Sequence, residues 1–195
     1  YWNDFSFIKR TVKSMKKLSS LGYSFIVITN QAGVARGFTK VNELKNIHKK
    51  MINYLYKKGI KILKVYTCTH GWEDDCNCRK PKTGMLSKLV KNNKINLSNS
   101  WFIGDTTTDI LCGQNFSLKT ILVKTGYGGY DNKYYVQPDF IFNNLHESAK
   151  FINSGYRKIY NNLNKIKLEL NSKNIFISGL SNSGKTTFSN VLKYY

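Results

Sequence analysis

The sequence predicts an α/β fold in which a mostly parallel β-sheet is covered by helices on both faces. Two observations support this prediction. Short runs rich in β-branched and aromatic residues alternate along the chain with segments whose apolar residues recur at helical spacing. Polar or glycine-containing stretches follow several of the strand-like runs, as in loops at the carboxyl ends of parallel strands. The alternation predicts a three-layer, Rossmann-like arrangement.

The predicted elements follow one another in order along the first 150 residues. The runs predicted as strands cover residues 23–29, 62–68, 101–104, 120–124 and 140–142. The segments predicted as helices cover residues 5–21, 41–58, 84–92 and 109–116, and the sequence becomes helical and polar again after Glu147. Gly22 and Gly59 end the first two helices, because glycine readily takes the left-handed backbone conformation that terminates a helix.

A second unit begins near the C-terminal end. Residues 174–178 predict a strand, and a Gly-x-x-x-x-Gly-Lys-Thr run follows it directly. In a P-loop, the backbone amides of this run cradle phosphates, while the lysine and threonine reach the terminal phosphates and Mg²⁺. We therefore expect one domain over residues 1–153, a linker helix over 154–172, and the opening of an ATP-binding P-loop kinase domain over 173–195. Its nucleotide-binding residues would be Gly179, Ser183, Gly184, Lys185 and Thr186.

The chain is strongly basic. Its 195 residues include 31 Lys+Arg and 11 Asp+Glu, which gives a formal net charge of +20. Such a charge suggests nucleic acid as a partner, but the lysines are scattered along predicted helices, as on solvated faces. We therefore expect nucleic acid not to be the partner. No apolar run approaches the roughly 18 residues of a membrane span, and no signal peptide opens the sequence, so we expect a cytoplasmic protein without membrane association.

Four metal-binding side chains lie close together in the sequence. Cys68, His70, Cys76 and Cys78 supply three thiolates and one imidazole, which is a ligand set of structural Zn²⁺ sites. Because these ligands fill all four tetrahedral positions, we expect a structural zinc ion that holds a loop in place. Cys112 stands apart from this cluster, and we expect it to be a core residue.

Two further segments carry side chains suited to phosphate. Arg79 and Lys80 follow the cysteine cluster directly, and together they could hold a dianion. The predicted strand 23–29 runs into Asn30 and Gln31, whose amides, with the hydroxyl of Thr29, could also bind phosphate.

A carboxylate follows the predicted strand 101–104. Asp105 is suited to Mg²⁺, which prefers hard oxygen ligands shared with a substrate phosphate. It could also serve as the N-cap of the next helix. Asp109 follows one helical turn later and could orient Lys80 or its loop.

The segments Thr29-Asn30-Gln31, Lys80 and Gly104-Asp105 to Asp109 together resemble three motifs of the haloacid dehalogenase-like phosphohydrolases. The run Cys-x-His to Cys-x-Cys-Arg-Lys-Pro narrows the resemblance to the D-glycero-D-manno-heptose 1,7-bisphosphate phosphatase / histidinol-phosphatase family, over about residues 1–150. The P-loop segment resembles the opening of an adenylylsulfate-kinase-like domain.

The resemblance implies a Mg²⁺-dependent phosphatase that acts on a sugar bisphosphate, such as D,D-heptose 1,7-bisphosphate, through an aspartyl-phosphate. It implies catalytic roles for Thr29, Lys80 and Asp105. Substrate contacts would come from Thr29, Asn30, Gln31, Ala32, Arg79 and Lys80. The Mg²⁺ ion would be held by Asp105 and Thr106, where relatives often have lysine in place of Thr106.

One feature departs from the family pattern. The family's nucleophile and its acid/base lie in a D-x-D motif on a central first strand, and no D-x-D precedes Thr29 in this sequence. We therefore expect the 195 residues to lack the first strand of the fold and to be inactive by themselves.

Three alternatives stay open at this point. A polynucleotide 3′-phosphatase/5′-kinase would also join such a phosphatase to a P-loop and would suit the positive charge. A histidinol-phosphate phosphatase shares the zinc loop. A non-catalytic module that binds sugar phosphates would need no nucleophile. The sequence does not indicate which sugar phosphate is used, what the kinase phosphorylates, or the oligomeric state.

Overall fold

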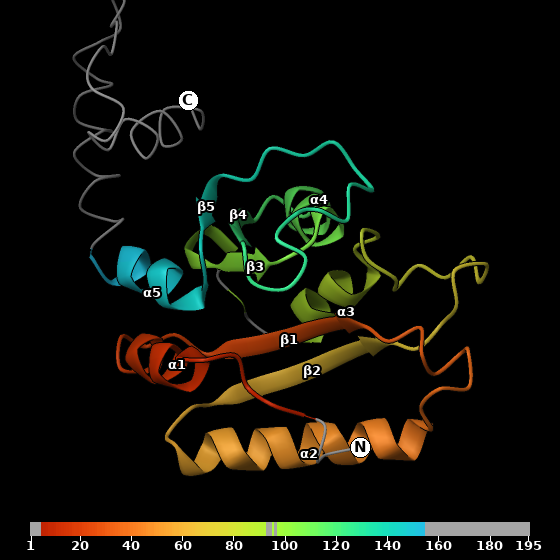
Figure 1. The fold of residues 1–195 in the computed structure, drawn as a ribbon, viewed down its shortest axis with the longest axis horizontal. Helices are drawn as coiled ribbons and strands as arrows, with labels where there is room; N and C mark the ends of the chain where they lie inside the picture. Colours follow the sequence, from red (N-terminus) through yellow and green to blue (C-terminus); the bar gives the residue numbers. More distant parts are fainter. Residues whose placement is uncertain (1–4, 93–94, 96, 155–195) are drawn as a thin grey trace, which may run out of the picture.

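The computed structural model describes residues 5–92, 95 and 97–154, and its strands and helices alternate as predicted (Figure 1). The strands are β1 (Phe25–Asn30), β2 (Ile62–Cys68), β3 (Trp101–Gly104), β4 (Lys119–Val123) and β5 (Phe140–Phe142). The helices are α1 (Thr11–Ser19), α2 (Val41–Lys57), α3 (Gly84–Asn92), α4 (Thr107–Gln114) and α5 (Leu145–Asn153). The predicted α/β class with parallel strands is confirmed.

The strands form two parallel sheets. β1 pairs with β2 in one sheet, and β3, β4 and β5 pair in that order in the other. Parallel pairing brings carboxyl ends together, so Asn30 lies opposite Cys68 in the first sheet and Gly104 opposite Leu122 in the second. Within the described residues no ladder joins β1 to β3, so β1 and β3 each keep one edge without a strand partner.

Side chains of β1 alternate between two helical layers. Phe25 and Val27 pack with residues of α1 and α2, whereas Ile26 and Ile28 pack with residues of α3 and α4. This alternation follows from the two-residue period of a strand, which places successive side chains on opposite faces. The same layers continue over the second sheet, because Phe102 of β3 belongs to the α3–α4 cluster. The predicted three-layer arrangement is therefore present.

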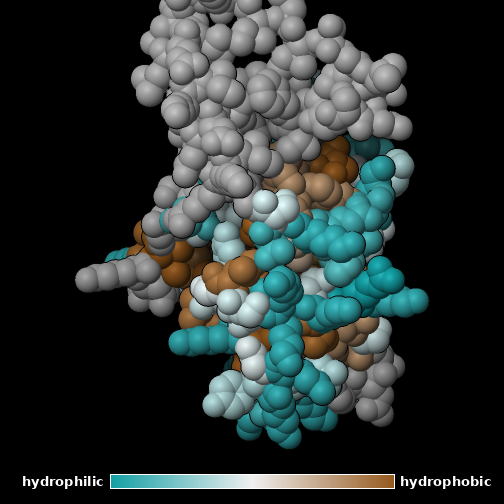
Figure 2. All heavy atoms as spheres, turned by 90° about the vertical axis from the view of Figure 1, so that its left-hand side faces the viewer, coloured by the Kyte–Doolittle hydropathy of each residue, from teal (hydrophilic) through white to brown (hydrophobic). Residues whose placement is uncertain are grey.

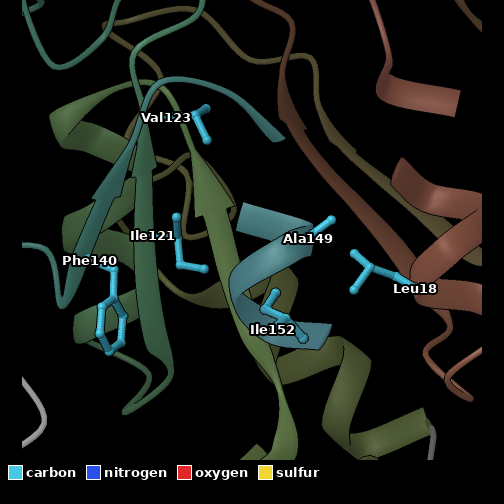
Figure 3. Close-up of a cluster of buried hydrophobic side chains, with 6 residues drawn as sticks. All are labelled: Leu18, Ile121, Val123, Phe140, Ala149 and Ile152. Atoms are coloured by element: carbon cyan, nitrogen blue, oxygen red, sulfur yellow. The ribbon is translucent and has the colours of Figure 1, made fainter. Parts of the chain in front are cut away.

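One hydrophobic cluster lies between the second sheet and the helices α1 and α5 (Figure 3). Its buried members are Leu18, Ile121, Val123, Phe140, Ala149 and Ile152. Phe25 of β1 and Ile103 of β3 pack against this cluster from their separate sheets. Side chains thus connect the two sheets where backbone hydrogen bonds do not.

The lysines of α1 are solvent-exposed. Lys13, Lys16 and Lys17 are exposed, while Met15 and Leu18 of the same helix are buried. Hydrophilic side chains cover much of the face drawn in Figure 2 and leave smaller hydrophobic patches between them. None of the helices in the described part of the chain is long and apolar enough to cross a membrane.

The first predicted helix is wrong in its extent. Helix α1 begins at Thr11 rather than at residue 5, and Arg10 before it has a left-handed backbone with φ 68°. The apolar residues upstream pack without a helix, because Phe7 stacks on Tyr54 of α2 with ring centroids 5.3 Å apart. The elements predicted between residues 23 and 142 match the structure to within about two residues at each end.

Candidate functional site

Lys80 connects β1 of the first sheet to helix α4, which follows β3 of the second sheet. Its Nζ donates to the carbonyl oxygen of Ile28 on β1 at 2.9 Å and to Oδ1 of Asp109 on α4 at 2.6 Å. The side chains of Lys80 and Asp109 are 10% and 9% exposed. Charges this deeply buried require a partner, so each holds the other in position. The prediction that Asp109 orients Lys80 is confirmed.

Asn30 fixes the main chain of Lys80. Its Nδ2 donates to the carbonyl oxygen of Lys80 at 3.1 Å, and its Oδ1 accepts from the amide nitrogen of Lys80 at 3.0 Å. One side-chain amide offers both a donor and an acceptor, so Asn30 can hold a backbone segment as a neighbouring strand would. Next to it, Gln31 Nε2 donates to Thr29 Oγ1 at 2.9 Å. Ala32 follows and is buried.

Thr106, and not Asp105, caps helix α4. The Thr106 Oγ1 accepts from the amide of Asp109 at 3.1 Å, and Asp109 Oδ2 accepts from the amide and the hydroxyl of Thr106 at 3.2 and 2.7 Å. This reciprocal arrangement is a capping box. The alternative in which Asp105 caps the helix is wrong, because its carboxylate instead accepts from the amide of Tyr127 at 2.8 Å.

Two glycines allow the carboxylates to pack against backbone. A Cβ atom at Gly104 would collide with the side chain of Asp109, and one at Gly126 would collide with the carboxylate of Asp105. Gly126 also has φ +70°, which side-chain-bearing residues rarely adopt. The Gly104-Asp105 pair and the glycine-rich segment after β4 are therefore packed directly against each other.

The four predicted zinc ligands meet at the end of β2. Their ligand atoms all lie within 4.8 Å of one another. The Sγ of Cys76 is 3.7 Å from that of Cys68 and 3.6 Å from that of Cys78, and Nδ1 of His70 is 3.6 and 3.1 Å from Cys68 and Cys78. Ligands around a tetrahedral zinc ion lie about 3.5–3.8 Å apart. Only the His70–Cys78 separation is clearly shorter, so the side chains fit a four-coordinate metal.

Arg79 turns away from Lys80, its neighbour in the sequence. Its Nη1 donates to the carbonyl oxygen of His70 at 3.1 Å, and its guanidinium carbon lies 4.5 Å from the centroid of the Trp72 ring. Consecutive cations of the predicted dianion site thus occupy different places: Lys80 lies between β1 and α4, and Arg79 lies over the cysteine loop.

The loop between β4 and β5 contributes residues that sequence reasoning missed. Asp131 accepts from the amide and the hydroxyl of Thr107, both at 2.7 Å, with its two carboxylate oxygens. The amide of Tyr134 donates to the same hydroxyl at 3.3 Å. These bonds anchor the loop to the first turn of α4. No local pattern marks Asp131, because the contact depends on the path of a long loop.

Cys112 is confirmed as a core residue. It is 1% exposed, and burial raises the pKa of its thiol to about 11. Its Sγ donates to the carbonyl oxygen of Lys82 at 3.8 Å.

The predicted P-loop residues lie outside the described part of the chain, as does nearly all of the predicted linker helix. They are Gly179, Ser183, Gly184, Lys185 and Thr186.

Comparison with known proteins identifies relatives of this chain. A family model described as HAD-hydrolase-like matches residues 77–148. The D-glycero-beta-D-manno-heptose-1,7-bisphosphate 7-phosphatase of Pseudomonas aeruginosa is 34% identical over 121 residues, which cover 62% of this chain and 68% of that protein. The corresponding protein of Pasteurella multocida is 34% identical over 131 residues, with coverages of 64% and 71%.

A solved structure extends the likeness to the fold. The crystal structure of D,D-heptose 1,7-bisphosphate phosphatase from B. bronchiseptica, complexed with magnesium and phosphate, matches with a TM-score of 0.72. The match covers 78% of this chain and 87% of that one at 24% identity. From the fold and the sequence relatives together, the chain belongs to the haloacid dehalogenase-like phosphatases of the D,D-heptose 1,7-bisphosphate phosphatase family.

Proposed function

We propose that this chain is part of a phosphatase that acts on a sugar bisphosphate similar to D,D-heptose 1,7-bisphosphate. The observation that carries the proposal is the position of Lys80, a nearly buried ammonium group held between β1 and Asp109 at the carboxyl ends of the strands. Such a fixed cation suits a phosphate dianion. The relatives named as 7-phosphatases of this bisphosphate support the choice of substrate.

Each residue near Lys80 would have a separate task. Lys80 would balance the charge of the transferring phosphate. The Thr29 hydroxyl would donate to a phosphate oxygen, because its oxygen accepts from Gln31 and its hydrogen remains available for another acceptor. Asn30 would act mainly through the Lys80 main chain that it holds, and Ala32 and Arg79 would contact the sugar side of the substrate.

The donor set at the end of β3 fits Mg²⁺. Asp105 presents a carboxylate at a strand tip, and only its Oδ2 has a hydrogen-bond partner among the described residues. Hard carboxylate oxygens are the protein ligands that Mg²⁺ prefers beside a substrate phosphate. Asp105 and the adjoining Thr106 would hold the ion. When bound, it would stabilise the negative charge of the phosphate.

The proposed route needs a nucleophilic aspartate. The resemblance puts it in a D-x-D motif on a central strand, and the sequence before Thr29 holds no such motif. β1 and β3 have edges without a strand partner in the described part of the chain, and a D-x-D strand would fit between them. We expect a polypeptide that includes this strand to be active and residues 1–195 alone to be inactive.

We further propose that the cysteine cluster binds a structural zinc ion. Four ligands leave no open position for a reacting water, so zinc would stabilise the loop that carries Arg79 and Lys80. Metal analysis of the purified protein should find about one zinc per chain, and Cys76→Ser should lose it. Cys112→Ser, at a buried cysteine outside the cluster, is the matched control. A protein with intact ligands and no zinc would disprove this part of the proposal.

The test of the activity compares three substrates with the complete protein. Release of phosphate from D,D-heptose 1,7-bisphosphate should exceed release from histidinol phosphate and from 3′-phosphorylated DNA by at least tenfold in kcat/KM. Omission of Mg²⁺ should abolish release. Faster hydrolysis of the DNA end, with strong salt dependence of binding, would replace our proposal with the polynucleotide phosphatase.

The P-loop segment supports a second domain with a separate activity. We propose that residues 173–195 open an ATP-binding kinase domain after a linker helix over 154–172, on the basis of the Gly-Leu-Ser-Asn-Ser-Gly-Lys-Thr run. In the complete protein, Lys185→Ala should weaken ATP binding about tenfold or more without changing phosphate release. Unchanged ATP affinity would exclude this assignment.

A further inference from the structure

A groove with a volume of about 700 Å³ lies between helix α2 and strand β2. The helix runs beside this strand (Figure 1). The groove reaches the first four residues of β2, so it lies away from the carboxyl ends of the strands and from the candidate site. The α2 residues that line it are Lys45, His48, Lys49, Ile52, Asn53 and Tyr56, and residues 62–65 of β2 form the other wall.

The lining residues of α2 recur at helical spacing and form one stripe along the helix. A different side of α2 covers the sheet, because Leu44, Met51 and Leu55 are its buried residues. At 100° per residue, the middle of the stripe lies roughly a third of a turn from that buried side. Ile52 joins the two sides, since it also packs against the core cluster. The stripe therefore overhangs the position that a strand added next to β2 would take.

β2 is an edge strand within the part of the chain that the structure describes. It pairs with β1 along one edge, and no described strand pairs with the other. A free edge offers N–H and C=O groups to an added strand. Two features restrict which strands can pair here: Leu63 is a bulge residue without a partner in β1, and Lys64 is exposed. Bulges and lysines are common devices against pairing of edge strands.

The groove is positively charged. Lys45, Lys49 and Lys64 are exposed, and no acidic residue is among the described residues that line the groove. Lys45 and Lys49 lie one helical turn apart, where like charges repel each other. The described ion pairs, Lys80–Asp109 and Lys82–Asp75, include none of these three lysines. A carboxylate placed in the groove would therefore meet cations that have no competing acidic partner.

We propose that the groove binds an acidic, extended segment of a partner protein, which adds as a strand to the free edge of β2. The carboxylates of the segment pair with the three lysines, and its apolar side chains pack on Ile52 and on Tyr56, which is 74% exposed. The stripe of α2 spans about 17 Å, which is the length of about five strand residues. This interaction is separate from the proposed phosphatase activity, because none of the groove residues belongs to the candidate site.

A second copy of this chain does not suit the groove. A two-fold contact between two β2 edges would bring the lysines of both grooves together. The chain has 31 basic and 11 acidic residues, and its only run of consecutive acidic residues is 73–75. That run is held in its own loop, because Asp74 accepts from the amide of Gly71 and Asp75 pairs with Lys82.

Binding of a synthetic peptide to the complete protein tests the proposal. The probe is an end-capped hexapeptide that alternates glutamate and valine, and the control peptide has lysine in place of glutamate. At low salt, where surface charges are least screened, the glutamate peptide should bind at least tenfold more tightly. Lys49→Glu and Lys64→Glu should each weaken its binding about tenfold. Lys17→Glu, which makes the same charge change at an exposed lysine of α1, is the matched control and should change affinity less than twofold.

A third peptide separates strand addition from attraction between charges alone. N-methylation of alternate amides keeps the three carboxylates of the glutamate peptide and removes the donors that pair with an edge strand. This peptide should bind at least fivefold more weakly than the unmethylated one. Equal affinity would overturn the strand addition.

Further outcomes would overturn the proposal as a whole. They are no binding of the glutamate peptide, equal binding of the lysine peptide, or equal effects of Lys49→Glu and Lys17→Glu. Tighter binding of single-stranded DNA or of vesicles with anionic lipid, lost in Lys49→Glu, would assign the groove to that ligand instead. Self-association in sedimentation that Lys49→Glu abolishes would assign it to a second copy. Phosphate release and melting temperature should be unchanged in all three variants, which shows that they remain folded.

Discussion

The two sheets hold their parts of one site in different ways. In β4, four of the five residues are buried, whereas in β1 all six are only partly buried. On the side of the second sheet, Asp105 and Asp109 are fixed by glycine contacts and a helix cap. On the side of β1, the link to the site runs through Asn30 and Lys80. The site is therefore joined across the sheets by a few side chains, and their removal should differ in effect from removal of core side chains.

Removal of Lys80 should have the largest effect. In the complete protein, Lys80→Met should lower kcat about 10³-fold by loss of charge stabilisation. It should also lower the free energy of unfolding by about 3 kcal/mol, because Asp109 remains buried without its partner. Phosphate release and urea unfolding measure the two effects. Lys82→Met is the matched control, since the Lys82–Asp75 pair is exposed and should leave the unfolding midpoint unchanged. Near-normal turnover of Lys80→Met would contradict the assignment.

The difference in burial between the sheets should appear in core substitutions. Ile121 of β4 is fully buried, so Ile121→Ala should cost about 3–4 kcal/mol through lost burial and a cavity. Ile28 of β1 is partly buried, and Ile28→Ala should cost about half as much. Both values come from urea unfolding. Equal costs would show that β1 is as well covered as β4.

Asn30 tests the connection from β1 to the site. Asn30→Ala removes both hydrogen bonds to the main chain of Lys80 and should cost about 1–2 kcal/mol of unfolding free energy. The rate of phosphate release should fall as well, because Lys80 loses its backbone support. Asn143→Ala, at an amide that contacts the exposed Glu147, serves as the control and should leave phosphate release unchanged. If both variants behave alike, Asn30 does not position Lys80.

Substitution of Asp139 should have the smallest effect on the free energy of unfolding, and this effect depends on pH. Burial raises the pKa of its carboxyl above 3.8, although Thr120 donates to it. The folded state therefore binds the proton more tightly than the unfolded state. This contribution to stability is present below pH 3.8 and is lost as pH rises through the folded pKa. Asp139→Asn should remove this slope from a plot of unfolding free energy against pH. An identical slope in both proteins would contradict the raised pKa.

Most of the fold could be predicted from the sequence because its strands are short apolar runs between glycines and polar residues. The helix predicted from residue 5 was wrong for a physical reason. The helical spacing of Phe5 and Ile8 also suits an extended segment, in which Phe5 packs against α2 and Ile8 stays 56% exposed. Apolar periodicity alone does not separate these cases.

The candidate site could likewise be predicted only in part from the sequence. The sequence indicates the cluster of Cys68, His70, Cys76 and Cys78 and the Lys80–Asp109 pair, because the residue types and their order suggest the chemistry. The contact of Asp131 with Thr107 could not be predicted, since it depends on how a long loop crosses the molecule. Thr106 was predicted near a metal ion, and the structure adds its capping contact with Asp109.

The boundary between β1 and β3 also affects how the molecule unfolds locally. Side chains cross this boundary, but among the described residues no backbone ladder does. A ladder of backbone hydrogen bonds breaks one bond after another, whereas two packed side-chain surfaces can separate in one step. The β1–β2 half and the β3–β4–β5 half would then behave as two foldons. Amide hydrogens at the unpaired edge of β1 would exchange with solvent before those between β3 and β4. A further strand that filled the boundary would slow the exchange of both sets of amide hydrogens.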